Sequence, residues 1–380
     1  MAQKNIEKKD SPTPTPPRAG DIEPFLTGRK TYLAPLPLPT DAHPYCPYIS
    51  DINDVYLDFG GGKPNVFTYQ LNLGIPFVCA LLIGLGGPLL SIFLGLFSGY
   101  NPKESWVLAV DLFWFSREYA FYIWLSGSIL CLPAWLHHHK LFTKIIPTRF
   151  NRQRREVCFM PDGATVPLFV PWESLCAWVI QSHSATQYGT TRQYGMGMGM
   201  GMGFEHEGEW VTLEFQCAGA QLGIAHWEAV RAFMAYELDD FNAIQDPLGL
   251  QGPNDPLHEG LHTFRNARTD MHRRLREKEV GWVYAFFWYV YHVMTFWTLP
   301  NRLVEWEIKR IEKTGRRALP QAMIDWSQPV PVEQRAKPSN NLVRLSAKVR
   351  TLRKQYPRHD ITEIFAAVYR AERPASGGKE

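Results

Sequence analysis

The chain has 380 residues, a formal net charge of +3, 45% hydrophobic residues and 13% aromatic residues. A charge this small disfavours a nucleic-acid-binding protein, which would carry a basic excess over a whole domain. The six cysteines include no CxxC pair, and we expect reduced, packed thiols because disulfide frameworks belong to small secreted domains. The first apolar run starts beyond residue 70, too late and too long for a secretory signal peptide.

The N-terminal region, residues 1–72, is expected to be irregular and cytosolic. Residues 1–30 combine lysines with the proline-rich run Ser11–Pro17, and such a segment buries too little apolar surface to offset its ordering entropy. Residues 31–72 contain several more prolines and a glycine cluster at 60–62 that marks a turn.

Residues 73–139 are predicted to form a transmembrane helical hairpin. No charged residue occurs from Pro64 to Pro102, and Ile75–Ser98 is almost continuously apolar. About 20 such residues cross a bilayer. A second apolar run, Tyr119–Leu136, is bounded by aromatic residues of the kind that anchor a span at the interface.

The distribution of basic residues predicts the orientation of this hairpin. Six basic residues follow the second run before any acidic one: Lys140, Lys144, Arg149, Arg152, Arg154 and Arg155. The positive-inside rule then places both chain ends in the cytosol, and leaves a short outward loop around residues 99–118. Within it, Ser105–Phe115 either lies along the interface or extends the second helix. We expect the six basic side chains to lie at the membrane surface, near anionic headgroups.

Residues 150–242 are predicted to form a small antiparallel β-barrel or sheet closed by a C-terminal helix, so that the fold class is an α+β membrane protein. The turn Pro161–Gly163 follows the first strand, and Trp172–Glu173 separates two others. The expected elements are strands at Val157–Met160, Val166–Pro171, Leu175–Gln181 and Trp210–Gln216, and a helix at His226–Leu238.

A low-complexity Gly-Met tract, residues 195–203, lies inside this unit. Its alternation is compatible with a strand that has one Met-lined face, but glycine at every second position weakens a strand. We therefore expect a flexible hairpin or loop. A copper(I) site built from thioethers is an alternative that lacks a second ligand cluster.

Residues 256–318 are predicted to form aromatic-rich, membrane-associated helices. The stretch 280–301 has no charged side chain and carries Trp282, Trp288 and Trp297 as candidate interfacial anchors. Because basic residues flank it on both sides, a helix on the membrane or packed against a domain is favoured over a third span. Residues 319–380 are expected to be a flexible, basic C-terminal region, with proline-rich linkers and a last helical stretch.

One motif, His258-Glu259-Gly260-Leu261-His262, matches the H-E-x-x-H pattern of zinc hydrolases. Pro256 and Gly260 count against it, because they place the motif at a helix start and weaken that helix. No clear third ligand is present, so a polar linker is the favoured interpretation. The run His137–His139 cannot form a single metal site on a helix. No phosphate-binding loop or dinucleotide fingerprint is present, and no cofactor is expected.

The segment Arg155–Gly163 followed by Val170–Glu173 resembles the opening of bacterial pleckstrin-homology-like membrane proteins. More narrowly, the chain resembles a proteobacterial family of two-span membrane proteins that is often encoded beside type VI secretion effectors. This resemblance implies a non-enzymatic inner-membrane binding protein, an immunity or accessory protein for such an effector. Its partners would be the lipid bilayer and a secreted toxin or a secretion component, and the family brings no established catalytic residues.

Two other functions stay open: a membrane-anchored adaptor that binds lipid or protein, and a zinc-dependent hydrolase using His258, Glu259 and His262. The sequence does not identify the partner or the oligomeric state.

Overall fold

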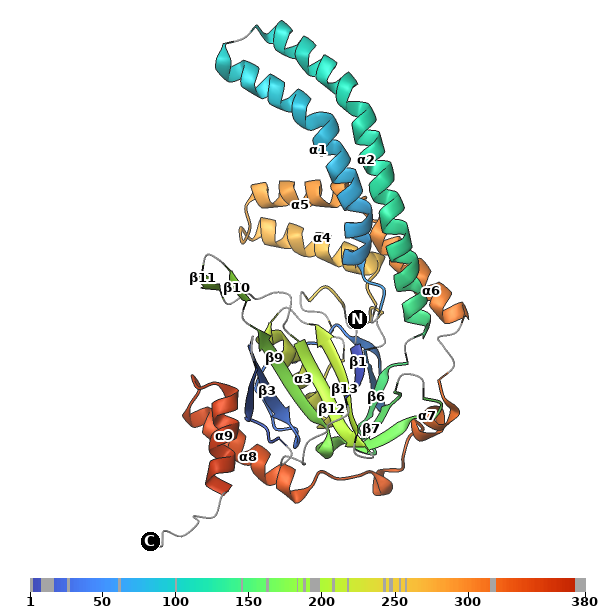
Figure 1. Cartoon of the computed structure of the whole chain (residues 1–380), viewed down its shortest axis with the longest axis vertical. Helices are drawn as coiled ribbons and strands as arrows, with labels where there is room; N and C mark the ends of the chain where they lie inside the picture. The colour runs from blue at the N-terminus through green and yellow to red at the C-terminus, as the bar shows by residue number, and fades with distance from the viewer. Residues whose placement is uncertain are drawn as a thin grey trace. The chain divides into compact units, whose positions relative to one another are not determined.

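Two antiparallel sheets and a set of helices make up the computed structural model of this α+β chain (Figure 1). The structure describes residues 3–7, 17–25, 28–60, 63–99, 101–144, 146–161, 164–182, 184–186, 189–191, 199–206, 209–216, 219–241, 244–245, 249–252, 254–256, 258–314 and 319–372. The chain divides into two compact units. The β unit comprises residues 1–62, 146–248 and 319–380, and the helical unit comprises residues 63–145 and 249–318.

The larger sheet of the β unit joins strands from distant parts of the sequence. Its order is β1-β13-β12-β9-β3-β2, all antiparallel. The strands are β1 (Gln3–Glu7), β2 (Ile22–Phe25), β3 (Gly28–Ala34), β9 (Cys176–Ser182), β12 (Gly199–His206) and β13 (Glu209–Gln216). Tyr32 of β3 lies opposite Trp178 of β9, which fixes the register with two buried rings.

The smaller sheet has the order β4-β5-β6-β7-β8, and a separate two-stranded ribbon pairs β10 with β11. The strands are β4 (Ile49–Ile52), β5 (Tyr56–Phe59), β6 (Thr148–Asn151), β7 (Glu156–Phe159), β8 (Leu168–Pro171), β10 (Ser184–Thr186) and β11 (Gly189–Thr191). A single 3-10 turn at Trp172–Ser174 links β8 to β9, and thereby the two sheets.

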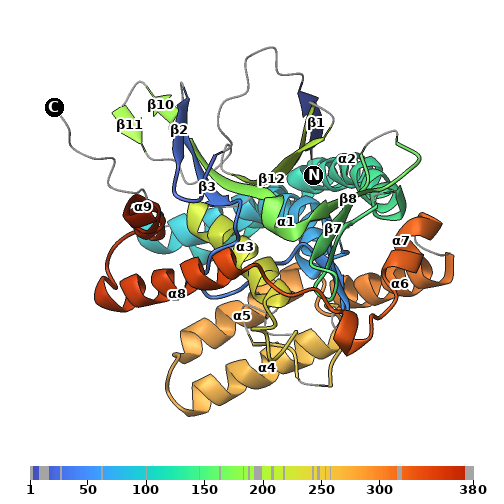
Figure 2. The ribbon, with the colours of Figure 1, turned by 90° about the horizontal axis from the view of Figure 1, so that it is seen from below.

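The core of the β unit lies between these sheets and α3 (Ala220–Met234), as Figure 2 shows from below. Trp172 stacks on Trp227 of α3 with ring centroids 5.1 Å apart, and Phe150 meets Trp172 edge-on at 5.7 Å. All three side chains are at least 98% buried. Large rings in one stacked group supply much of the apolar burial that holds the two sheets and α3 together.

The N-terminal region is regular in part: it contributes strands to both sheets, whereas residues 35–48 contain no helix or strand, as expected for this proline-rich stretch. β3 pairs with β9 and β5 pairs with β6, so residues from 28–34 and 56–59 complete both sheets. The expectation of an unstructured region 1–72 is wrong for these strands. It also follows that residues 150–242 do not form a self-contained unit, because each sheet needs strands from before the hairpin.

The C-terminal region is also more ordered than expected. It contains α7 (Gln321–Trp326), a short 3-10 turn (Val332–Gln334), α8 (Asn340–Gln355) and α9 (Ile361–Glu372). Met323 packs on Ile146 and Cys158, while α8 and α9 bury Val349 and Phe365. The predicted last helical stretch is confirmed by α8 and α9. The flexibility predicted for the linker that precedes it is wrong at α7, whose Met323 is buried in an apolar cluster.

The Gly-Met tract is a strand where the structure describes it. β12 includes residues 199–203, and residues 195–198 lie outside the described part of the chain. Met200 and Met202 are buried in the core, and a Cβ at Gly201 would overlap the indole of Trp178. The predicted loop is wrong here: the Met-lined face is core, and glycine gives room for a tryptophan ring on the neighbouring strand.

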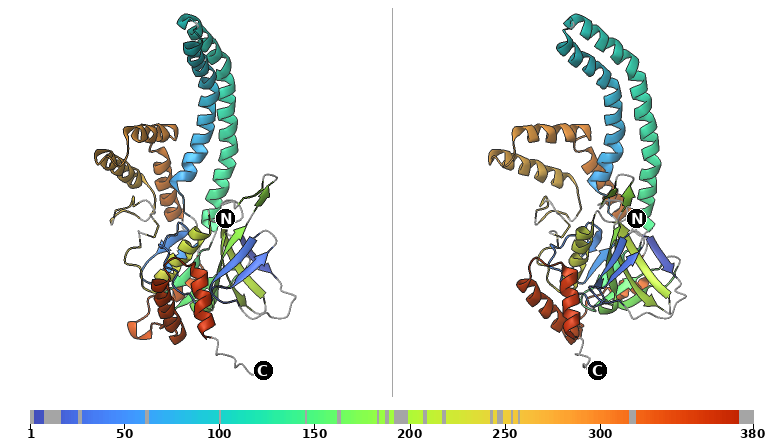
Figure 3. Two further views of the ribbon diagram at one scale, coloured as in Figure 1. Left: turned by 90° about the vertical axis from the view of Figure 1, so that its left-hand side faces the viewer. Right: turned by 60° about the vertical axis from the view of Figure 1, so that its left-hand side comes forward.

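The helical unit is built on two long helices, α1 (Val66–Ser98) and α2 (Pro102–Lys144), which pack along each other in antiparallel fashion (Figure 3). Gly99 ends α1 in the left-handed region, with φ of 71°, and α2 begins three residues later. The segment Ser105–Phe115 extends the second helix. The expected outward loop at 99–118 is wrong, because nearly all of it is helical.

Three shorter helices complete the helical unit: α4 (Leu261–Arg276), α5 (Trp282–Met294) and α6 (Leu299–Thr314). α4 and α5 run across the axis of the long hairpin, and α5 lies between α4 and the turn of the hairpin (Figures 1 and 3). The stretch 280–301 is not one helix, because Phe296 and Trp297 adopt positive φ values of 65° and 56°. α5 has 13 residues, about 20 Å of helix, which is too short to cross a bilayer core of about 30 Å.

Candidate membrane-binding surface

The surface of the long hairpin is apolar where a water-soluble protein would be polar. Large side chains on both helices are exposed, among them Phe97 at 76%, Leu96 at 73%, Leu130 at 75% and Phe115 at 68%. α1 carries no charged residue along its length, and of the described helices it alone is long and apolar enough to cross a membrane. A continuous apolar surface of this kind requires an apolar environment or a partner.

Small residues let the two long helices approach closely. Gly84 lies against Ala120, and the carbonyl oxygen of Gly84 accepts a hydrogen bond of 3.0 Å from the Ser116 hydroxyl. Gly95 lies against Ser105 in the same way nearer the turn. Close approach through glycine, alanine and serine is the usual packing of helices in lipid.

These contacts fix which residues of α1 and α2 lie at the same level. Gly127 packs on Pro76, and the Trp135 indole nitrogen donates to the Tyr69 hydroxyl at 3.0 Å. The second apolar run, Tyr119–Leu136, is therefore mostly level with the first half of α1. The two apolar runs predicted from the sequence are staggered along the hairpin, and they face each other only between the contacts of Pro76 with Gly127 and of Gly84 with Ala120.

The stagger has a consequence for the charged residues of α2. The apolar run of α1 beyond Gly84 is level with the N-terminal half of α2, which carries Asp111, Arg117 and Glu118. All three side chains are exposed. A charged side chain in the centre of a bilayer costs about 2.5–3.5 kcal/mol on insertion scales, so this part of α2 is unusual for a helix in lipid.

A hollow of about 480 Å³ lies between α1 and α2 close to their turn. It exists because small residues replace large ones on both helices: its lining includes Gly87, Ser91, Gly95 and Ser105, beside Leu94 and Leu108. Its walls are mainly hydrocarbon, with the Glu104 carboxylate among them.

α5 forms an aromatic platform beside α1. Phe296, just after α5, contacts Phe77 with ring centroids 4.9 Å apart, and the Tyr291 hydroxyl donates to the Gln70 side chain at 3.0 Å. These contacts place α5 level with residues 70–77 of α1, where its apolar run begins. The exposed rings and aliphatic side chains of α5 are Trp282, Val283, Tyr284, Phe286, Phe287, Tyr291 and Val293.

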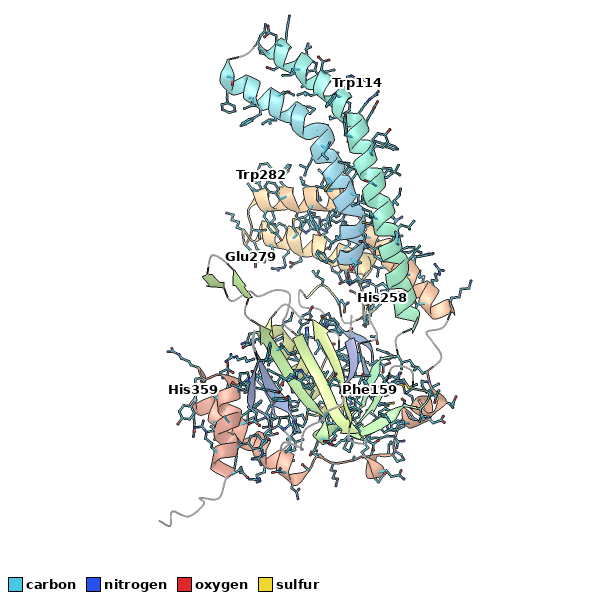
Figure 4. The ribbon with its side chains drawn as sticks, viewed as in Figure 1. Trp114, Phe159, His258, Glu279, Trp282 and His359 are labelled. Carbon is cyan, nitrogen blue, oxygen red and sulfur yellow. The ribbon has the colours of Figure 1, made fainter. Side chains whose placement is uncertain are left out.

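The three predicted interfacial tryptophans have different environments. Trp282 is 75% exposed at the start of α5, and Figure 4 labels it there. Trp297 stacks on Tyr289 with an interplanar angle of 15°, and Trp288 contacts Phe264 of α4 at 5.8 Å. Trp282 is therefore available to an interface, whereas Trp288 and Trp297 join α5 to α4.

α4 presents a charged surface beside this aromatic platform. Arg273 forms ion pairs with Asp270 at 2.7 Å and with Glu277 at 2.5 Å, and Arg265 and Arg268 are exposed. Exposed ion pairs of this kind add little stability. The apolar α5 and the charged α4 together make a two-layered arrangement typical of helices at a membrane surface.

Four of the six basic residues predicted at the membrane surface, Arg149, Arg152, Arg154 and Arg155, bond to partners inside the β unit. Lys140 and Lys144 lie in the last turns of α2. Arg149 is only 4% exposed, and its guanidinium donates to both oxygens of Asp58 at 2.6 and 2.8 Å, and to Ser327 at 2.8 Å. Burial by itself lowers the pKa of Arg149, but the hydrogen bonds and charge of Asp58 outweigh it and raise this pKa.

The other three arginines also serve the β unit. Arg152 is 7% exposed, pairs with Asp54 at 2.9 Å and lies over the rings of Phe233, Tyr236 and Phe241. Arg154 donates to the Trp326 carbonyl at 2.9 Å, and Arg155 pairs with Glu173 at 3.0 Å. The predicted headgroup contacts are therefore wrong for residues 149–155, because these side chains satisfy carboxylates, carbonyls and rings inside the fold.

The H-E-x-x-H segment does not have the geometry of a zinc hydrolase. α4 begins at Leu261, so His258 and Glu259 precede the helix that should carry them (Figure 4). Glu259 instead accepts a hydrogen bond from the backbone nitrogen of Val66, at the start of α1. Among the residues that the structure describes, no three His, Cys, Asp or Glu side chains gather as metal ligands. The segment holds two helix starts, those of α1 and α4, in place.

Comparison with known proteins found no family model, no curated protein and no solved structure that matches this chain.

Proposed function

We propose that this protein is anchored in a bilayer by the α1–α2 hairpin and works by binding a partner protein. The observation that carries the proposal is the surface of the hairpin, where the exposed large apolar side chains of both helices are 38–76% exposed. In water such a surface would drive aggregation, whereas hydrocarbon is the solvent that it matches.

The dimensions of the hairpin support this placement. From Phe77, which contacts Phe296 just after α5, to Ser98, α1 extends about 32 Å at 1.5 Å per residue. The hydrocarbon core of a bilayer is about 30 Å thick. The aromatic platform of α5 then lies at one interface and the α1–α2 turn at the other, and α2 returns through the bilayer.

The proposed orientation keeps both chain ends in the cytosol of a bacterial cell. The positive-inside rule acts during insertion, before the β unit has folded. Arg149 and its neighbours therefore still favour retention on the cytosolic side, although they are later buried. Exposed arginines on α4 and lysines on α6 contribute to the same bias.

The test is membrane association of the full chain. We expect the purified protein to float with phosphatidylethanolamine–phosphatidylglycerol vesicles and to resist extraction with alkaline carbonate. A variant with four polar substitutions on α1, Leu82→Ser, Leu89→Ser, Phe93→Ser and Phe97→Ser, should be extracted. Four serine substitutions at exposed apolar positions of the β unit, Ile22, Val166, Val332 and Val343, are the matched control and should leave it bound. Release of the unaltered protein by carbonate would refute the anchor.

The immunity role implied by the family resemblance is a second proposal, and it concerns the β unit. Its support is the order of elements: β6, β7 and β8 pair in sequence, β9, β12 and β13 follow in the other sheet, and α3 packs on both. This order is compatible with a pleckstrin-homology-like unit that binds protein or lipid. Co-expression with a type VI effector encoded beside the gene tests it. If cells without the gene resist that effector equally well, the immunity role is refuted.

A further inference from the structure

The outer face of α2, defined as the side that points away from α1, carries a regular stripe of acidic and apolar residues. Asp111 and Glu118 are seven residues apart, and a large apolar residue follows each of them three positions later. The stripe consists of Val107, Asp111, Trp114, Glu118 and Phe121. All five side chains are exposed. Glu104, seven residues before Asp111, lines the hollow between α1 and α2 and is not part of this face. A spacing of alternately three and four residues is the pattern by which one helix packs along another.

Two of the acids lie level with the middle of the apolar run of α1. Leu112 approaches Gly87, and Ser116 and Ala120 contact Gly84. Asp111 and Glu118 flank these contacts on the same helix but point away from α1. In the proposed anchor they are therefore directed at hydrocarbon, where ionisable side chains occur mainly when they face another helix.

Within the part of the chain that the structure describes, neither Asp111 nor Glu118 has an ion-pair partner. The guanidinium of the nearby Arg117 lies over the ring of Trp114, 4.3 Å from the centroid, and therefore lies on the same stripe without forming an ion pair with either acid. In the proposed anchor, a basic side chain from another molecule would supply the ion-pair partner that these two carboxylates lack among the described residues.

We propose that the outer face of α2 binds a membrane-spanning helix of a partner protein that carries Lys or Arg residues one heptad apart. This proposal rests on the proposed bilayer anchor. The basic side chains of the partner neutralise Asp111 and Glu118, and its apolar side chains pack on Val107, Trp114 and Phe121. Charge complementarity inside the bilayer gives the contact its specificity, because any other helix leaves two carboxylates unpaired.

A second copy of this chain is the less suitable occupant. Two copies inserted with the same orientation bring their α2 helices together in parallel, with equal depths in contact. Asp111 would then meet Asp111, and Glu118 would meet Glu118. Like charges at facing positions oppose this pairing, whereas a cationic helix relieves the same charges.

The experiment uses the full chain in phosphatidylcholine vesicles, which carry no net headgroup charge. The probe is a leucine-rich single-span peptide with two lysines seven residues apart near its centre. The matched peptide has glutamine at both positions. Energy transfer between labelled protein and labelled peptide reports association. We expect the lysine peptide to bind at least about tenfold more tightly than the glutamine peptide. The double variant Asp111→Asn and Glu118→Gln should lose this preference, while Arg117→Gln should keep it.

Each other outcome is decisive. Equal binding of the two peptides to protein that floats with the vesicles would overturn the inference and leave the anchor intact. Energy transfer between two labelled copies of the chain that exceeds the transfer to the lysine peptide would show that a second copy occupies the face. Failure of the protein to float with the vesicles would refute the anchor itself, and flotation is measured in the same samples.

Discussion

The two units of this chain have opposite polarity. The β unit buries charge: Arg149 and Arg231 are 4% and 5% exposed, each paired with carboxylates. The helical unit exposes hydrocarbon: Phe97 and Trp282 are 76% and 75% exposed. The β unit follows the ordinary rule for a protein in water, where a buried charge must be paired. The helical unit has large exposed apolar side chains on α1, α2 and α5, as the proposed bilayer anchor requires.

The two units also differ in the environment of their arginines. Arginines in the β unit are structural, because each finds carboxylates, carbonyls or rings within the fold. Arginines on α4 are exposed, and those with partners have them on the same helix or its end. Counting basic residues along the sequence cannot tell these two classes apart. Substitutions in each unit test whether buried charge stabilises the β unit and exposed apolar surface inserts the helical unit.

Removing Arg149 should have the largest effect on the stability of the β unit. Arg149→Ala removes the guanidinium that pairs with the buried Asp58 carboxylate, and breaking a buried ion pair in this way destabilises a fold by about 3–5 kcal/mol. Urea unfolding in detergent, followed by near-ultraviolet circular dichroism, measures the change. Lys337→Ala, at an exposed site, is the control and should change stability by less than about 0.5 kcal/mol. Equal effects of the two substitutions would contradict the buried ion pair.

A charge on the apolar surface of the helical unit should act on insertion instead of folding. Leu89 is 62% exposed on α1, and Leu89→Arg should disfavour insertion by about 3 kcal/mol. Val332 is 69% exposed on the β unit, and Val332→Arg should be neutral because its surroundings are water. The fraction of each variant in carbonate-washed membranes is the measurement. A loss caused by Val332→Arg that equals the loss caused by Leu89→Arg would remove the distinction between the two surfaces.

The Gly-Met tract offers a test of packing inside the β unit. A Cβ at Gly201 overlaps the indole of Trp178, whereas a Cβ at Gly281 meets nothing within 4 Å. Gly201→Ala should destabilise the β unit by about 1–3 kcal/mol, the usual effect of overpacking. Gly281→Ala should be close to neutral in the same unfolding assay. A neutral Gly201→Ala would show that the glycine is not there to make room for Trp178.

The smallest expected effect is a pH dependence from His226. Burial lowers the pKa of His226, whose Nδ1 donates to the Tyr45 carbonyl at 2.7 Å. The unfolded chain binds a proton near pH 6.5, where the folded chain does not, so stability is full above about pH 6.5 and falls as the pH drops below it. His226→Gln should flatten this part of the stability profile, measured by urea unfolding between pH 7 and pH 5. His359→Gln, at an exposed histidine labelled in Figure 4, should leave the slope unchanged.

Local patterns in the sequence predicted the local elements well. α1 covers the first apolar run, and β7, β8, β9 and β13 fall on the expected strands. Periodicity and composition determine such elements over short stretches. The single helix favoured for residues 280–301 is instead interrupted at Phe296 and Trp297, which adopt positive φ values.

The same local patterns do not predict contacts between residues that are distant in the sequence. Nothing in residues 28–34 indicates that they pair with residues 177–182, on the far side of the hairpin in sequence. The burial of Arg149 depends on Asp58, which is 91 residues away. The alignment of α1 with α2 depends on the positions at which glycine residues of one helix contact serine residues of the other. This alignment determines which residues of α1 lie beside Asp111. Each of these features joins distant segments, so a single sequence read locally does not contain it.

The account rests on the hairpin crossing the bilayer twice, and labelling at its turn tests this most directly. Asn101→Cys at the turn and Lys337→Cys in the β unit are placed singly in a background that lacks the other accessible cysteines, including Cys79 and Cys131. A membrane-impermeant maleimide applied to intact spheroplasts should label the cysteine at position 101 and not the one at 337. Inverted vesicles should give the reverse. Labelling of position 101 from the cytosolic face, or of both positions from the same face, would contradict the two-crossing hairpin.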